Sequence, residues 1–160
     1  MVDMKSALAY SCNCYFAALA DEIGAGKLAK TMRQVGMDAD SRFELETSRN
    51  SIYLAKGATE SELVETAIGQ GRTGVTPLYM AMLASAFAND GMMMKPYIVD
   101  HVVYPDGTET KNTVPEKLTE ICTAEEAAAI RDMMIGVVSG GTGTAAAING
   151  VTVAGKTGTA

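Results

Sequence analysis

The last residues of the chain combine side chains that could bind an anionic ligand. Lys156 supplies an ammonium group, and Thr157 and Thr159 supply hydroxyl groups on either side of Gly158. Glycine leaves room for a ligand to approach the backbone, and an ammonium group beside hydroxyl donors suits a negatively charged partner. We therefore predict that this end of the chain faces an anion.

A second candidate pair lies near the other end of the chain. Ser11 and Asn13 place a hydroxyl and a carboxamide two positions apart, just before an apolar segment with helical spacing. Serine and asparagine are also frequent in helix caps and turns. Taken alone, this pair is better explained as a cap or a solvated turn than as a catalytic site.

Considered together, the two stretches resemble two of the three motifs of penicillin-binding transpeptidases and serine β-lactamases, with Ser-x-Asn at 11–13 and Lys-Thr-Gly at 156–158. Between them, Ile-Gly-Gln-Gly at 68–71, Val-Thr-Pro-Leu at 75–78 and Ala-Asn-Asp-Gly at 88–91 are similar to the transpeptidase domain of penicillin-binding proteins. The resemblance extends through nearly the whole chain. It implies a mainly helical α+β fold of the β-lactamase/transpeptidase type, with an incomplete sheet in this chain.

The resemblance also implies a function for the parent protein. Members of this family are peptidoglycan D,D-transpeptidases, which cross-link stem peptides through a serine acyl-enzyme and are acylated by β-lactams. The expected partners are therefore D-Ala-D-Ala stem peptides and β-lactams, with no cofactor. The expected location is the extracytoplasmic face of the bacterial cell membrane, with the membrane anchor outside this chain.

Three catalytic roles follow from the same resemblance. Ser11 would relay a proton to or from the leaving group, and Asn13 would hydrogen-bond the substrate amide. Lys156 would supply positive potential for the carboxylate of the donor peptide or of a β-lactam.

The substrate-binding residues implied by the resemblance follow Lys156 directly. The hydroxyls of Thr157 and Thr159 would bind the same carboxylate, and the Thr159 backbone N–H would form half of an oxyanion hole. Gly158, which has no side chain, would let the substrate lie alongside the backbone.

The family's nucleophile is a serine followed three positions later by lysine, and no serine in this sequence has that spacing. The nearest pattern, Thr108 followed by Lys111, has threonine and falls in a predicted hairpin. We therefore expect this chain to be an internal fragment, from the Ser-x-Asn to the Lys-Thr-Gly motif, that is inactive alone. A noncatalytic domain of the same fold that senses or binds β-lactams is an alternative. An unrelated helical interaction domain is disfavoured by the two motifs.

Two nucleotide-binding patterns also occur near the C-terminus. Residues 150–157 satisfy the phosphate-loop pattern, but that loop needs a strand before it and a helix after it, and here the spacer itself has strand character. Residues 141–146 resemble a dinucleotide fingerprint, but no acidic residue follows Asp132. The sequence context therefore disfavours both interpretations.

The amino-acid composition disfavours several classes of protein and of site. The 160 residues, 48% hydrophobic, suit one globular domain. The net charge of −6 disfavours a nucleic-acid partner, and no apolar run has the length of a membrane span. Cys12, Cys14, Cys122 and His101 do not have the spacing of a metal site.

The elements that must position these residues begin with a helical lobe over 4–91. Its apolar spacing predicts helices within 4–35, interrupted by Gly24, and a short helix over 59–68. Thr76, followed by proline, predicts the start of a further helix.

The rest of the predicted partial transpeptidase domain, 1–160, alternates between strands and one helix. A hairpin is expected over 97–114, and a capping-box sequence opens a helix over 124–139. A terminal strand is expected over 151–160, and without sheet partners it would be disordered or would pair with a second copy of the chain.

Overall fold

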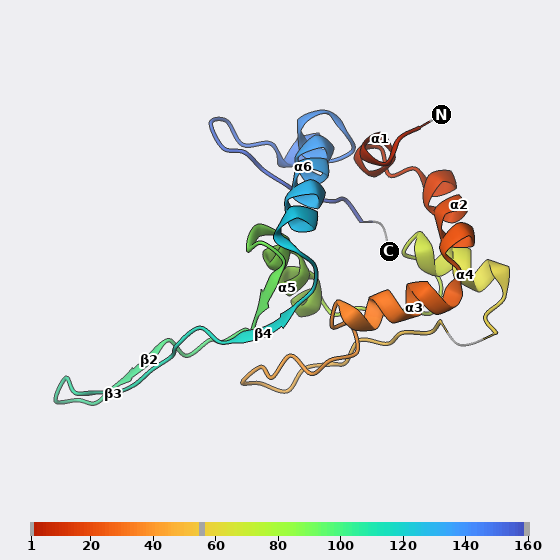
Figure 1. Cartoon of the computed structure of the whole chain (residues 1–160). Coiled ribbons are helices and arrows are strands. Elements are labelled where there is room, and N and C mark those ends of the chain that lie inside the picture. The colour runs from red at the N-terminus through yellow and green to blue at the C-terminus, as the bar shows by residue number, and fades with distance from the viewer. Residues whose placement is uncertain (1, 55–56, 159–160) are drawn as a thin grey trace.

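The structure is a computed structural model that describes residues 2–54 and 57–158 (Figure 1). The helices are α1 Met4–Ala9, α2 Asn13–Ile23, α3 Ala25–Gln34, α4 Glu60–Ala67, α5 Pro77–Ala88 and α6 Ala124–Gly140, with a 3-10 helix, η1, at Thr144–Ala146. The strands are β1 Met92–Met94, β2 His101–Val103, β3 Glu109–Asn112 and β4 Lys117–Glu120. Two antiparallel pairs, β1 with β4 and β2 with β3, form separate two-stranded sheets. Within the described ranges, no helix is both long and apolar enough to cross a membrane.

Local capping signals start the later helices where the sequence predicts them. Thr59 and Glu62 form a reciprocal capping box at α4, and Thr123 and Glu126 form another at α6. Thr76 caps α5 by accepting a hydrogen bond from the backbone of the third helical residue. The helices predicted in these three places are therefore confirmed.

The capping box of α6 should respond to acid. The backbone N–H and hydroxyl of Thr123 donate to Glu126 at 2.8 and 2.9 Å and lower the pKa of this carboxyl. Because the folded-state pKa is depressed, the stabilisation is present above the unfolded-state value of about 4.3 and is lost as the pH falls through the folded-state value. We expect Glu126→Gln, which does not titrate, to reduce the fall in unfolding temperature below about pH 4.3. Thermal unfolding at a series of pH values measures this, and Glu125→Gln in the same helical turn is the matched control, because that carboxyl lies outside the capping box.

The N-terminal helices have one more break than the sequence pattern indicates. A turn at residues 10–12 separates α1 from α2, and Gly24, with φ at 79°, separates α2 from α3. The continuous helical spacing of 4–35 did not reveal the first break. It did place Ser11 just before a helix, which the structure confirms.

The helices bury two apolar clusters, and a strand pair that was not predicted adjoins the first. That cluster consists of Met37, Tyr79, Met82, Ala86 and Met93, and the second of Ala20, Ala29, Leu54 and Leu63. Met93, the central residue of β1, is only 1% exposed. The Tyr79 hydroxyl donates to the Val35 carbonyl at 3.2 Å, and burial raises the Tyr79 pKa to about 12. The segment that carries β1 is short and consists of methionine, so neither its length nor its composition indicated a strand.

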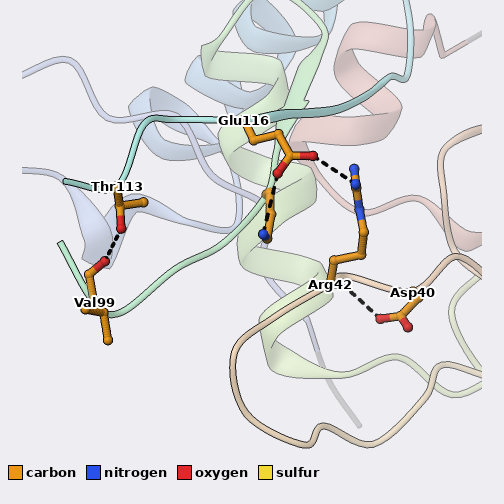
Figure 2. Close-up of polar contacts among 6 residues, drawn as sticks. Asp40, Arg42, Val99, Thr113 and Glu116 are labelled. Atoms are coloured by element: carbon orange, nitrogen blue, oxygen red, sulfur yellow. Dashed lines mark hydrogen bonds and ion pairs between the residues drawn. The ribbon is translucent and has the colours of Figure 1, made fainter. Parts of the chain in front are cut away.

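The predicted hairpin is present as β2 and β3 and extends away from the helices (Figure 1). Its paired segments are shorter than the predicted span of 97–114, because the chain on either side of them is irregular. Figure 2 shows how its base is held: Arg42 donates to Glu116 at 2.8 Å, and the Thr113 hydroxyl donates to the Val99 carbonyl. The polar loop that precedes α4 therefore packs against the hairpin base.

The C-terminal segment differs from the predicted strand. Val151 makes a single bridge with Ile148, and residues 152–158 have no ladder partner within the part of the chain that the structure describes. The Gly155 N–H instead donates to the Met134 carbonyl of α6 at 3.2 Å. This segment is paired with neither of the two-stranded sheets, and its backbone is hydrogen-bonded to helix α6 instead. Self-association through this segment stays a prediction.

Candidate active site

The fold brings the two chemically interesting ends of the chain into contact. Lys156 Nζ donates a hydrogen bond to Ser11 Oγ at 3.0 Å, although the two residues are 145 positions apart. Helices α1 and α6 pack against each other and carry these ends together. The pair is exposed, so a ligand can reach both side chains.

Ser11 occupies a backbone position that usually belongs to glycine. The Cys12 N–H donates to the Ala7 carbonyl at 2.9 Å, and the Ser11 N–H donates to the Leu8 carbonyl at 3.3 Å. These two bonds define a Schellman motif at the end of α1, whose left-handed residue is Ser11, with φ at 52°. A non-glycine residue costs about 1 kcal/mol in this conformation. The turn thus presents a hydroxyl where a glycine would give a more relaxed backbone.

This geometry predicts an unusual order of stability at position 11. Ser11→Gly and Ser11→Ala both remove the hydroxyl, but only alanine keeps the steric strain of the left-handed backbone. We expect the glycine variant to have a free energy of unfolding about 1 kcal/mol higher than the alanine variant, measured by urea denaturation. The same two substitutions at Ser139, an exposed position within α6, should show the reverse order. Equal stabilities at position 11 would contradict a left-handed turn.

Lys156 retains the capacity to bind a ligand. Its ammonium group has three N–H donors, of which one reaches Ser11 and one reaches the Thr157 carbonyl at 2.8 Å. Over residues 2–54 and 57–158, no ion pair includes Lys156. The site therefore presents a positive charge that no described carboxylate neutralises.

A turn after α6 joins both halves of the site. The Thr142 N–H donates to the Ala9 carbonyl at 2.9 Å, and the hydroxyls of Thr142 and Thr157 lie 2.8 Å apart. A Cβ on Gly141 would lie only 2.1 Å from the Ala9 oxygen, so this close approach requires glycine. No sequence motif indicated Thr142 as a site residue. Its position between Gly141 and Gly143, directly after a capped helix, was the available signal.

The structure gives fewer contacts for the other residues that were predicted to belong to the site. Asn13 is the first residue of α2, and its exposed side chain has no hydrogen-bond partner among the residues whose structure is described. A Cβ on Gly158 would meet nothing within 4 Å, so the backbone there is open to a ligand. Thr159 lies outside the described residues.

Sequence comparison identifies relatives over the full length of the chain. The family model "Penicillin binding protein transpeptidase domain" matches residues 1–160. The chain is 32% identical to penicillin-binding protein 3 of Bacillus subtilis, covering 99% of this chain and 23% of that protein. It is 35% identical to the peptidoglycan D,D-transpeptidase PbpA of Mycolicibacterium smegmatis, covering 99% of this chain and 32% of that protein. The chain thus spans less than a third of these curated relatives.

Solved structures share the fold. The D,D-transpeptidase domain of a peptidoglycan glycosyltransferase from Eggerthella lenta superimposes with a TM-score of 0.91 at 36% identity, covering 99% of this chain and 42% of that one. The imipenem acyl-enzyme complex of penicillin-binding protein A from Mycobacterium tuberculosis gives 0.86 at 30% identity, covering 99% and 36%. The fold class expected from the sequence is confirmed.

Proposed function

The chain belongs to the penicillin-binding protein transpeptidase family, and we propose that its protein cross-links peptidoglycan as a D,D-transpeptidase. Residues 1–160 would form one wall of the acyl-transfer site. The observation that carries the proposal is the 3.0 Å contact between Lys156 Nζ and Ser11 Oγ, because it joins the two motifs in one exposed, positively charged site.

Ser11 is suited to the proton transfer that acyl transfer requires. When a nucleophile attacks the D-Ala-D-Ala amide, or the β-lactam ring, the departing nitrogen must gain a proton. The Ser11 oxygen accepts a hydrogen bond from Lys156, so its own proton is free to be donated to that nitrogen. Lys156 can then return a proton to Ser11 and regain one from the proton that the attacking nucleophile releases, which restores the ammonium charge. Asn13, at the start of the next helix, would hydrogen-bond the substrate amide.

The anion-binding role belongs to the residues around Lys156. A stem peptide ends in a carboxylate, and a penicillin carries one beside its reactive ring. The free donor of Lys156 and the hydroxyl of Thr157 would bind this group, because charge-assisted hydrogen bonds are stronger than neutral ones. Gly158 leaves the backbone open for the ligand, and Thr159 would add a second hydroxyl and an oxyanion-hole N–H.

We also propose that the protein works at the extracytoplasmic face of the cell membrane. The support is chemical: peptidoglycan is the substrate named for its relatives, such as the D,D-transpeptidases PbpA and MrdA. Cell fractionation combined with protease treatment of intact spheroplasts tests this, since a domain facing the cytoplasm would stay protected.

The acyl-transfer proposal is tested by intact-mass spectrometry with benzylpenicillin. We expect the full-length protein encoded by the gene to gain one stoichiometric adduct. Residues 1–160 alone should keep their mass, because no serine among them precedes a lysine by three positions. An adduct on the 160-residue chain would identify a nucleophile within it, with Ser11 the first candidate, and would overturn the assigned roles.

A second assay separates the transpeptidase from the noncatalytic alternative. A protein that is acylated and also releases D-alanine from a D-Ala-D-Ala peptide is a transpeptidase or carboxypeptidase. A stable adduct without reaction of the peptide would favour the noncatalytic domain that senses β-lactams.

A further inference from the structure

We propose that Thr142 is a positioning residue of this site, which orients the Thr157 hydroxyl toward the carboxylate of the ligand. This inference rests on the proposed function, because it assumes that Thr157 binds the carboxylate. Nothing in the two family motifs includes Thr142, which lies outside both of them in the turn between α6 and η1.

The contacts of Thr142 reach both halves of the site at once. Its backbone N–H donates to the Ala9 carbonyl, two residues before Ser11, and its hydroxyl lies 2.8 Å from that of Thr157, next to Lys156. Thr142 therefore connects the turn that carries the proton relay with the segment that carries the positive charge. A shift of either half would strain one of these two bonds.

The backbone around Thr142 is held firmly enough to orient a neighbour. The N–H groups of Gly141 and Gly143 donate to the same Val137 carbonyl, at 3.1 and 2.9 Å. Gly143 is buried, and a Cβ there would lie 3.1 Å from the Val137 side chain. With the backbone fixed on both sides, the Cβ of Thr142 stays in one place, and its β-branching restricts the χ1 rotamers that its hydroxyl can adopt.

The chemistry of the two hydroxyls determines the direction of the hydrogen bond. Either oxygen can be the donor in the free protein. When Thr157 donates its single proton to a carboxylate, it can only accept from Thr142, so Thr142 becomes the donor. The resulting chain of two hydroxyls ends on an anion, and each hydrogen bond polarises the next. Without Thr142, the Thr157 hydroxyl is free to rotate among staggered positions and is less often directed at the ligand.

The test uses the full-length protein and the kinetics of acylation by benzylpenicillin. We expect Thr142→Val, which keeps the shape and the backbone bond to Ala9, to lower the second-order acylation constant about fivefold to tenfold. The loss should appear in the dissociation constant of the initial complex and not in the first-order acylation step, because the contact acts on carboxylate binding. Thr142→Ser should restore most of the loss. Ser139→Ala, at an exposed position of α6 three residues away, is the control and should react like the wild type.

A double-mutant cycle and an uncharged probe make the test specific. If Thr142 acts through Thr157, Thr142→Val should have no further effect in a Thr157→Val background. The methyl ester of benzylpenicillin has no anion, so its reaction should not respond to Thr142→Val. Additive effects in the cycle, an equal loss for the ester, or wild-type kinetics for Thr142→Val would each overturn the proposal.

A measurement that needs no activity separates this inference from the proposed function. Three-bond NMR couplings report the χ1 rotamer of Thr157, and we expect one rotamer in the wild type and averaged couplings in Thr142→Val. If the folded wild type is not acylated at all, the proposed function fails, and the rotamer measurement still decides whether Thr142 positions Thr157. Averaged couplings in the wild type would contradict the positioning role.

Discussion

Replacing Lys156 with methionine is expected to lower the second-order rate constant of acylation by benzylpenicillin about a hundredfold in the full-length protein. Methionine keeps much of the length of the side chain but removes the charge, the bond to Ser11 and the donor that is free for a carboxylate. Hydrogen bonds to charged groups contribute about 1.5–3 kcal/mol each, and every 1.4 kcal/mol corresponds to a factor of ten. Lys156 is exposed, so the unfolding temperature should change little.

Matched variants separate the site from general charge effects. Lys156→Arg keeps the positive charge but replaces a compact ammonium with a planar guanidinium, so we expect partial activity. Lys27→Met removes another exposed lysine, in α3, and should react like the wild type. Acylation of Lys156→Met within about twofold of the wild-type rate would remove Lys156 from the proposed mechanism.

A second large effect is expected on stability, from Gly141→Ala. The new Cβ would lie 2.1 Å from the Ala9 carbonyl oxygen and 3.0 Å from the Val137 Cα. Both neighbours are backbone atoms, so the turn and the end of α1 must move apart. That movement would break the bond from the Thr142 N–H to Ala9. We expect a loss of about 3 kcal/mol in the free energy of unfolding, measured by urea denaturation.

The preceding glycine provides the control. Gly140 is the last residue of α6, and a Cβ there would meet nothing within 4 Å. Alanine is a better helix former than glycine, so Gly140→Ala should be neutral or stabilising by up to about 1 kcal/mol. Similar losses for the two alanine variants would show that the close contact with Ala9 does not form in solution.

The helix boundaries were the most accessible part of the fold, because their determinants lie within a few residues. A capping box needs only Thr123 and Glu126, three positions apart, and Thr76 caps the adjacent helix in the same local way. The hairpin was predictable for the same reason, since its turn at 105–107 separates two short runs that pair directly. The motifs, their order and their spacing also indicated the family, which the comparisons confirm.

Local sequence patterns did not predict the structure of segments whose partners are distant in the chain. Val151 and its successors have the composition of a strand, yet residues 152–158 bond to α6 and to the site instead of to a ladder. β1 consists of methionines and pairs with β4, which follows more than 20 positions later. A segment forms a strand only where the edge of another strand is available for hydrogen bonding. A local sequence pattern does not indicate whether that edge is present.

The chemical groups of the site are set by the amino-acid sequence: a serine and an asparagine at one end, and a lysine among hydroxyls at the other. The folded chain was needed to show that Lys156 contacts Ser11, that Ser11 lies in a left-handed turn, and that Thr142 joins the two halves. The physical reason is the packing of α1 against α6, which closes a gap of 145 positions. The amino-acid sequence specifies the residue types. The distances between remote side chains are set only when the helices that carry them pack together.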